Sequence, residues 1–185
     1  MARFTPTTFI FITGGTCSGK SRFAIELAKQ WPGRIAYLAT CSAADEEMRH
    51  RIARHRRDRP TNWKTIEHPA DPAKALIQLN KAVRGVVFDC LTMYVSDLLV
   101  HGHSDAAIQR QIRRLCRTIR TLSYPVLMVT NEVGWGVVPE HPLGRRFRDV
   151  AGLANQIAAR AADHVYLLVA GIPLCLKKTR VTCDV

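Results

Sequence analysis

The feature that most limits the possible folds is the segment TGGTCSGKS, residues 13–21, which matches the pattern G-x-x-x-x-G-K-[ST]. The β-branched apolar run FIFIT leads into it, and a helical pattern over residues 20–30 follows it. Strand, glycine loop and helix in this order predict the first unit of a parallel α/β sheet. They also predict a loop that binds phosphate at the start of the helix.

Short apolar runs alternate with helical patterns along the rest of the chain. The runs are continuous, which is typical of strands covered on both faces. We therefore expect an α/β fold: a single P-loop domain over 1–185, with a mostly parallel central sheet flanked by helices on both faces. Loose ends are expected at about 1–8 and 179–185, with KKTRVTCDV as a tail. The expected strands are 9–13, 35–39, 86–90, 126–130 and 165–170, and the expected helices are 20–30, 45–58, 72–83, 105–121 and 143–161.

The glycine loop has the chemistry of a triphosphate site. Its glycines let successive backbone N–H groups point at phosphate oxygens, and the following helix adds a partial positive charge. Lys20 is expected to act as a catalytic group at the β- and γ-phosphates, and the Ser21 hydroxyl is expected to bind Mg²⁺. The loop residues expected to hold nucleotide are Gly14, Gly15, Thr16, Cys17, Ser18, Gly19, Lys20 and Ser21.

A carboxylate at the end of another strand extends this site. Asp89 closes the run VVFD, a place where P-loop enzymes carry a second group that organises magnesium. The alternative is an Asp that only begins a turn. The predicted metal ligands are therefore Ser21 and Asp89. The N-K-x-D motif that reads the base in regulatory GTPases is absent. The loop alone leaves kinase, nucleotidyltransferase and ATPase activity open.

Composition bears on location and partners. The net charge is +12, with 27 Lys and Arg against 15 Asp and Glu, so a surface that binds nucleic acid is one interpretation. The arginines lie scattered among helical patterns without aromatic side chains to stack on bases, which favours solvated helix faces and a polyphosphate site. No run of about 18 apolar residues occurs, so no membrane span is expected. The six cysteines lack zinc spacing and indicate reduced thiols in a cytoplasmic enzyme.

A charged helical pattern at 45–60 contains two histidines. At about 100° per residue, Met48, Ile52 and His55 share one helix face, whereas His50 points the other way, toward solvent. Cations near His55 favour an unprotonated ring nitrogen, which can attack phosphorus and form a phosphoramidate. The alternative is a hydrogen-bonded histidine on a half-buried helix face.

Several longer segments carry a resemblance to a known family. They are TGGTCSGKSR, H-x-x-x-R-P-x-x-W-x-T-x-E, VVFDCLTMYVSDLL and T-N-E-V-G-x-G-[IV]-V-P-E, in this order between Ile12 and about Lys177. The chain resembles the bifunctional adenosylcobinamide kinase/adenosylcobinamide-phosphate guanylyltransferases of cobalamin biosynthesis. The resemblance implies phosphorylation of the aminopropanol hydroxyl of adenosylcobinamide by a nucleoside triphosphate. It also implies transfer of GMP from GTP to that phosphate, with release of pyrophosphate.

The resemblance also implies roles for single residues. The second reaction passes through a guanylylated histidine, and the matching position is His55, because Arg54 stands where relatives often carry a second histidine. Glu67 is implied to read guanine, since a carboxylate can accept from N1–H and N2–H₂ together; its alternative is a surface carboxylate. The other implied nucleotide-binding positions are Ala39, Thr40, Cys41, Arg56, Arg57, Asp58, Arg59 and Asp89.

The implied cofactors are GTP, ATP and Mg²⁺, and the implied partners are the corrinoid substrates and a homo-oligomer, expected to be a trimer. Nucleic acid is not an expected partner. Cys17 stands where family loops usually have Arg, and Asp89 where relatives often have Glu. Two alternatives stay open: retention of only one of the two activities, or a basic P-loop protein that binds nucleic acid. Arg145, Arg146 and Arg148 are either contacts for a substrate phosphate or a surface cluster.

Overall fold

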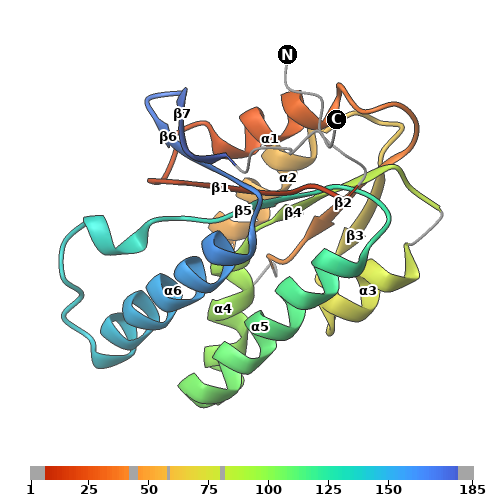
Figure 1. Ribbon diagram of the computed structural model, residues 1–185. Coiled ribbons are helices and arrows are strands. Elements are labelled where there is room, and N and C mark those ends of the chain that lie inside the picture. Colours follow the sequence, from red (N-terminus) through yellow and green to blue (C-terminus); the bar gives the residue numbers. More distant parts are fainter. Residues whose placement is uncertain (1–6, 42–45, 58, 80–81, 179–185) are drawn as a thin grey trace.

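The apolar runs form a seven-stranded sheet (Figure 1). The structure is a computed structural model that describes residues 7–41, 46–57, 59–79 and 82–178. The strand order is β3-β2-β4-β5-β1-β6-β7, and neighbours are parallel except β6 and β7, which form an antiparallel hairpin. The strands are β1 (Phe9–Gly14), β2 (Ile35–Ala39), β3 (Lys64–Glu67), β4 (Gly85–Asp89), β5 (Val126–Val129), β6 (His164–Val169) and β7 (Ile172–Lys178).

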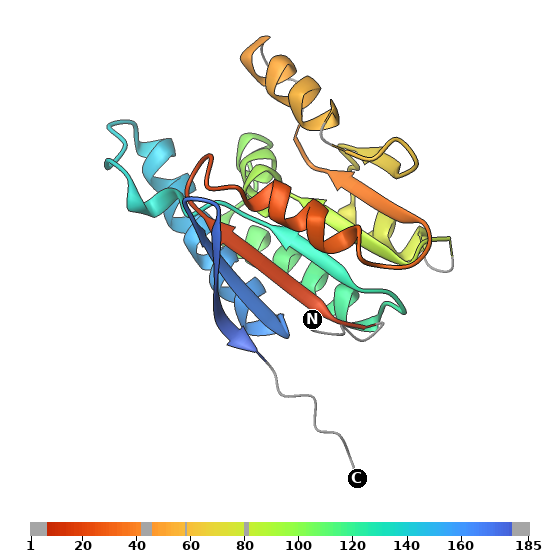
Figure 2. The same cartoon turned by 90° about the horizontal axis from the view of Figure 1, so that it is seen from above.

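Helices cover both faces of the sheet, but unevenly. In Figure 1, α1 lies on one face and α3, α4, α5 and α6 lie on the other. Figure 2 shows α2 standing away from the sheet, beyond the carboxyl ends of β2 and β3. The helices are α1 (Lys20–Ala28), α2 (Glu46–Arg57), α3 (Pro72–Gln78), α4 (Leu91–Val100), α5 (Asp105–Thr121) and α6 (Pro142–Ala161), with a short 3₁₀ helix η1 (Val133–Trp135).

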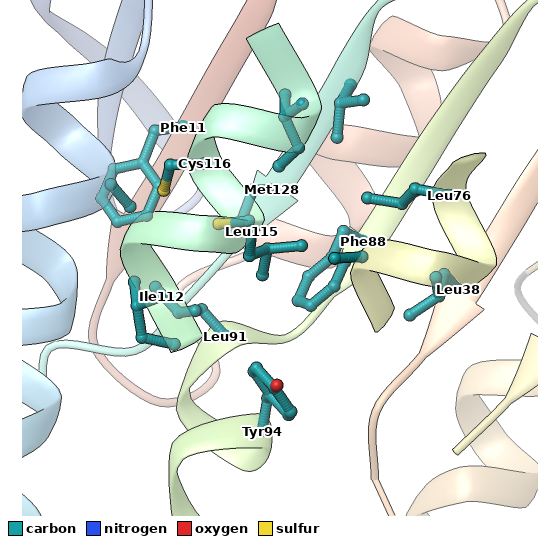
Figure 3. Close-up of a cluster of buried hydrophobic side chains, with 14 of the residues drawn as sticks. Phe11, Leu38, Leu76, Phe88, Leu91, Tyr94, Ile112, Leu115, Cys116 and Met128 are labelled. Atoms are coloured by element: carbon teal, nitrogen blue, oxygen red, sulfur yellow. The ribbon is translucent and has the colours of Figure 1, made fainter. Parts of the chain in front are cut away.

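Strand β1 explains why the strands read as unbroken apolar runs. Phe9 and Phe11 point into the larger core cluster, on the side of α3 to α6. Ile10 and Ile12 point into a second cluster under α1. All four side chains are almost fully buried, because each face of the strand is covered by helices. Figure 3 shows part of the larger cluster, where strand residues meet side chains of α3, α4 and α5.

Helix α5 shows the amphipathic pattern that the sequence predicts. Ile108, Ile112, Leu115 and Ile119 are buried at helical spacing against the sheet. Ser104 caps the helix, and its hydroxyl accepts a hydrogen bond from a backbone N–H of the first turn. The observed bounds are the predicted ones, 105–121.

The mostly parallel α/β fold with helices on both faces is confirmed, but four elements were not predicted. They are β3, α4, η1 and β7. The expected tail was wrong for Lys177 and Lys178, which belong to β7 and pair with β6. Thr8, expected in a loose end, is buried, and its carbonyl accepts the Val126 N–H. The other parts of the expected loose ends, 1–6 and 179–185, lie outside the described residues.

Candidate nucleotide-binding site

The glycine loop joins β1 to α1 at the carboxyl edge of the sheet. Its first glycine, Gly14, has φ 149°, and a Cβ there would lie 2.4 Å from the carbonyl oxygen of Leu168 in β6. Gly19 precedes α1 with φ 93° in the left-handed region. The backbone N–H of Gly171, in the turn between β6 and β7, donates to the carbonyl of Ser18 at 3.0 Å. The loop therefore fits tightly against the β6–β7 hairpin.

Lys20 is the first residue of α1, and it is buried despite its charge. Its Nζ donates to the carbonyl of Gly15 at 2.5 Å and to Ser18 Oγ at 3.3 Å. The ammonium group is thus folded beneath the loop, where it is held by the same backbone that would surround a phosphate. A buried ammonium at a helix N-terminus favours an anion in the loop.

Asp89 ends β4, next to Ala39 of β2 and Val129 of β5 in the strand register. The hydroxyl of Tyr37 donates a hydrogen bond to Asp89 Oδ2. Burial raises the pKa of the Tyr37 phenol well above its ordinary value, and the adjacent carboxylate of Asp89 raises it further. Tyr37 therefore stays protonated and holds one oxygen of Asp89 in place.

Thr40 follows β2 and fixes the backbone just after Asp89. Its hydroxyl donates to the carbonyl of Cys90 at 2.6 Å and accepts from the N–H of Cys90 at 2.9 Å. The N–H of Thr40 donates to the Asp89 carbonyl at 3.0 Å. Thr40 therefore supports the site through the backbone rather than through a direct contact with the cavity.

Arg59 carries a positive charge on an almost fully buried side chain. Its side chain is only 6% exposed, and its guanidinium carbon lies 3.8 Å from the centre of the Tyr37 ring. Arg59 Nη1 lies 3.9 Å from Glu67 Oε1, which is an ion pair but too long for a hydrogen bond. Among the described residues, no group accepts a hydrogen bond from its Nε or its Nη1. Buried N–H donors without partners are costly, so this guanidinium is suited to an anionic ligand.

Arg56 and Glu67 form a bidentate pair near Arg59. Arg56 Nε lies 2.7 Å from Glu67 Oε1, and Arg56 Nη2 donates to the second oxygen. This hydrogen bonding holds the pKa of Glu67 below its ordinary value and raises the pKa of Arg56. Glu67 is therefore an ionised acceptor, but both its oxygens are engaged by Arg56.

These groups line one cavity of about 880 Å³, a volume in the range of small-ligand sites. Most of the predicted nucleotide-binding residues line it: Thr16, Cys17, Ser18, Gly19, Lys20, Ser21, Ala39, Cys41, Arg56, Arg59, Glu67 and Asp89. Four others do not line it: Gly14, Gly15, Thr40 and Arg57. Asp58 lies outside the described residues, as does the side chain of His55, whose backbone belongs to α2.

One side of α2 faces this cavity. Arg49, Ile52, Ala53 and Arg56 line it, at the spacing of a single helical stripe. His50 is exposed and lies 3.9 Å from the carboxylate of Glu46, so it faces solvent as expected. None of the described side chains of α2 is buried. The helix thus presents its residues to the cavity while standing apart from the core.

Sequence reasoning missed several residues of the site. Tyr37 is one of them, because it lies in a continuous apolar strand and nothing in that pattern indicates that its hydroxyl reaches Asp89. Met93 and Asn131 also line the cavity. Asn131 belongs to TNEVG, which directly follows a predicted strand. Because ligands bind at the carboxyl ends of parallel strands, this position could have identified Asn131 as a site residue.

The three arginines of the segment after TNEVG lie outside this cavity. Arg145 donates to the carbonyls of Pro139 and Glu140, at 3.0 and 2.5 Å. Arg146 pairs with Asp105, and Arg148 pairs with Asp149. Their contacts within the described residues are those of a loop and helix surface.

Two features are absent from the described residues. None of the helices there has the length and apolarity needed to cross a bilayer. Among the same residues, no three or more His, Cys, Asp or Glu side chains gather as a metal site. A magnesium ion held by one carboxylate, a hydroxyl and phosphates needs no such cluster.

Comparison with known proteins adds the chemical context. The sequence of the family described as "cobinamide kinase / cobinamide phosphate guanyltransferase" matches residues 10–176. The chain is 39% identical to the "bifunctional adenosylcobalamin biosynthesis protein CobP" of Pseudomonas aeruginosa, over 90% of this chain and 95% of that protein. It is 38% and 39% identical to the proteins named CobU of Escherichia coli and Salmonella typhimurium, in each case over 91% of this chain and 99% of the relative.

A solved structure is similar in fold. It is a KaiC-like protein from Pyrococcus horikoshii OT3, with a TM-score of 0.55, 15% sequence identity, and coverage of 89% of this chain and 72% of that one. At this level of identity the similarity supports the α/β architecture and nothing about the reaction.

Proposed function

We propose, because the chain belongs to the cobinamide kinase / cobinamide phosphate guanyltransferase family, that one nucleotide site serves both reactions. This site is the cavity of about 880 Å³. The protein is an enzyme of adenosylcobalamin biosynthesis with kinase and guanylyltransferase activity. It uses a nucleoside triphosphate, and cobinamide fits the family as its substrate. GTP as guanylyl donor and ATP or GTP as phosphoryl donor are parts of the proposal.

The observation that carries the proposal is the composition of the cavity wall. The phosphate loop, Asp89, the buried Arg59 and one side of α2 all border the same space. Ile52 of α2 lines it, and position 55 lies about 60° around the helix from Ile52, at 100° per residue. Position 55 therefore lies next to the stripe of α2 that lines the cavity, just past its edge at Ile52. We therefore assign the covalent step to His55.

In the guanylyl transfer, a ring nitrogen of His55 attacks the α-phosphorus of GTP. The P–N bond forms as the bond to the pyrophosphate oxygen breaks, and pyrophosphate leaves. A phosphate oxygen of cobinamide phosphate then attacks the same phosphorus, and the P–N bond breaks to free the histidine. The glycine loop and Lys20 grip the leaving pyrophosphate in this reaction.

In the kinase reaction, the hydroxyl of the aminopropanol arm attacks the γ-phosphorus, and the nucleoside diphosphate leaves. The loop and Lys20 then hold the group that is transferred. Arg59, whose buried side chain borders the cavity, supplies a second positive charge to the same polyphosphate chain.

The residues present fit a magnesium ion. The Ser21 hydroxyl and the Asp89 carboxylate both border the cavity, and Tyr37 fixes one Asp89 oxygen. A bound Mg²⁺ would neutralise charge that develops on the phosphate oxygens.

Glu67 is the proposed reader of guanine. Its pKa is held low by Arg56, so it is a carboxylate that can accept from both N1–H and N2–H₂ of the base. Because Arg56 occupies both oxygens in this structure, guanine binding requires Arg56 to turn away or to share them. A base without two adjacent donors does not replace that ion pair, which gives a physical reason for a preference for GTP over ATP in the guanylyl step.

We also propose that the enzyme works as a homo-oligomer, with a trimer as the expected state, in the cytoplasm and without nucleic acid as a partner. Support for association comes from β7, an edge strand whose apolar residues are exposed. Ile172, Leu174 and Leu176 are 71%, 55% and 56% exposed, and edge strands with such surfaces are usually covered.

The decisive experiment uses GTP labelled at the α-phosphate. The wild-type protein should take up covalent label that is lost in acid and kept in base, as expected of a phosphoramidate. H55A should take up none. H50A is the matched control, because His50 lies on the same helix, is exposed and faces solvent. It should be labelled like the wild type.

Labelling of H55A at the wild-type level would show that another residue is the nucleophile. The two reactions are then assayed separately, with adenosylcobinamide and with its phosphate as acceptors. Turnover of only one acceptor would mean that only one activity persists with Cys17 in the loop. Competition between ATP and GTP in the first assay identifies the phosphoryl donor.

A further inference from the structure

Glu132 lies beside the phosphate loop, on the segment that follows β5. Its backbone N–H donates to the carbonyl of Gly14 at 3.1 Å. Its carboxylate oxygen Oε1 accepts from the hydroxyl of Thr13 at 2.6 Å. Thr13 and Gly14 are the last residues of β1 before the loop turns, so Glu132 is attached to the loop by backbone and side chain together.

A buried amide holds the same carboxylate oxygen from the other side. Asn155 of α6 is 7% exposed, and its Nδ2 donates to Glu132 Oε1 at 3.1 Å and to the carbonyl of Asn131 at 3.0 Å. Thr130 donates to Asn155 Oδ1 at 2.7 Å, which sets the orientation of the amide. Oε1 is therefore fixed, whereas no residue in the described part of the chain bonds to the second oxygen, Oε2.

The network reaches the nucleotide cavity. Asn131, next to Glu132, lines the cavity, and its N–H donates to the hydroxyl of Thr92 at 2.7 Å. Thr92 in turn lies 2.9 Å from the hydroxyl of Thr130. A hydrogen-bonded network of this kind holds the end of β5 rigidly against β1 and α6.

The charge of Glu132 needs an explanation. Within the described residues it pairs with no Lys, Arg or His, yet it lies beside a loop built to bind anions. An uncompensated carboxylate there repels a triphosphate, and a neutral glutamine would accept the same two hydrogen bonds without that cost. A structural role alone therefore does not account for a carboxylate at this position, whereas a role as a proton acceptor does.

The two reactions differ in their need for a proton acceptor. Guanylyl transfer uses a histidine nitrogen and then a phosphate oxygen, and a phosphate monoester is largely ionised near pH 7. The kinase reaction uses an alcohol, whose proton must leave as the oxygen attacks. We propose that Glu132 is the general base of the kinase step and that it takes no part in guanylyl transfer.

In that step, the hydroxyl oxygen of cobinamide forms a bond to the γ-phosphorus of the nucleoside triphosphate. The bond between that phosphorus and the bridging oxygen breaks, and the nucleoside diphosphate leaves with the electron pair. The hydroxyl proton passes to Glu132 Oε2. This assignment rests on the proposed function in one respect, that the triphosphate lies in the glycine loop for both reactions.

The test compares E132Q with wild type in both half-reactions. The kinase kcat of E132Q should fall by about 100-fold or more, because general base catalysis is worth about 10² to 10⁴. The KM for the nucleoside triphosphate should be unchanged or lower, because a neutral amide beside the loop does not repel the phosphates. Labelling of His55 by α-labelled GTP, and GMP transfer to adenosylcobinamide phosphate, should stay at wild-type rates. E140Q is the control, because Glu140 is an exposed acid on the same loop.

Two results would overturn the assignment. One is a kinase kcat for E132Q within about 3-fold of wild type, since a structural carboxylate is replaced well by an amide. The other comes from E132D, which keeps a carboxylate one methylene shorter. It should exceed E132Q in kinase kcat by about 10-fold or more, and a value equal to or below that of E132Q contradicts a base. Failure of the wild type to take up label refutes the histidine mechanism separately, because the kinase assay does not use labelled protein.

Discussion

Arg59 provides the sharpest test of the cavity as a polyphosphate site. Its side chain is 6% exposed, stacks on Tyr37 at 3.8 Å, and has two nitrogens, Nε and Nη1, without a hydrogen-bond partner among the described residues. The substitution R59M keeps most of the apolar stem and removes the charge. Loss of the stacking costs about 0.5 to 2 kcal/mol, and removal of unpaired buried donors returns a similar amount. The free energy of unfolding of the free protein should therefore change by less than about 1 kcal/mol.

Nucleotide binding should respond quite differently. A hydrogen bond to a charged group contributes about 1.5 to 3 kcal/mol, so the Kd for a non-hydrolysable GTP analogue should rise about 10- to 150-fold in R59M. Calorimetric titration measures the Kd, and urea unfolding measures the stability. R117M is the control, because Arg117 is exposed on α5, on the far side of the sheet from α1.

If R59M binds the analogue as tightly as wild type, Arg59 is not a contact for the polyphosphate. The same conclusion follows if R59M unfolds about 3 kcal/mol more easily, since that loss is typical of breaking a buried ion pair. In that case Arg59 would be a structural partner of Glu67 and Tyr37, and the unpaired N–H groups would have no functional meaning.

Three further predictions concern the loop and its surroundings. T40V should lower the free energy of unfolding by about 1 to 3 kcal/mol in urea, because it leaves the buried N–H of Cys90 without a partner and its C=O with only the Tyr94 N–H. G14A should abolish nucleotide binding in a filter assay, because the new Cβ would lie 2.4 Å from a backbone oxygen. G152A lies within α6, where a Cβ meets open space, so it should raise the free energy of unfolding by about 0.5 to 1 kcal/mol. Burial raises the pKa of the Cys90 thiol to about 12, so iodoacetamide at pH 8 should modify exposed Cys17 and spare Cys90. Mass spectrometry of the folded protein measures both modifications. GTP should protect Cys17, because Cys17 lines the cavity.

The central strands could be predicted because burial on both faces makes them continuous apolar runs. β3 and β7 could not. The four residues of β3 are mostly exposed, and β7 contains a proline and exposed side chains along its length. Such segments become strands because a neighbour offers backbone partners, which is a property of the assembled sheet and not of the local sequence. Helix α4 is apolar around most of its circumference, so its pattern lacks the alternation of faces that identifies a helix.

The site also has one part that the sequence predicts and one part that it does not. The glycine loop could be predicted because eight consecutive residues determine both its shape and its chemistry. The partners that tune it come from distant parts of the chain. Thr13 and Glu132 are 119 residues apart, and Tyr37 and Asp89 are 52 apart. No spacing rule links such pairs. The register of β1 with β5 brings Thr13 and Glu132 together, and the register of β2 with β4 brings Tyr37 and Asp89 together.

The contact between the phosphate loop and the β6–β7 hairpin has a consequence for synthesis of the protein. The loop is made about 150 residues before the hairpin, but Gly14 packs against the carbonyl of Leu168, and Ser18 accepts its hydrogen bond from Gly171. A nascent chain that has not yet released the hairpin therefore lacks one wall of the loop. We therefore expect nucleotide capture only after residues up to Gly171 have left the ribosome, and a fragment that ends before the hairpin should bind GTP poorly.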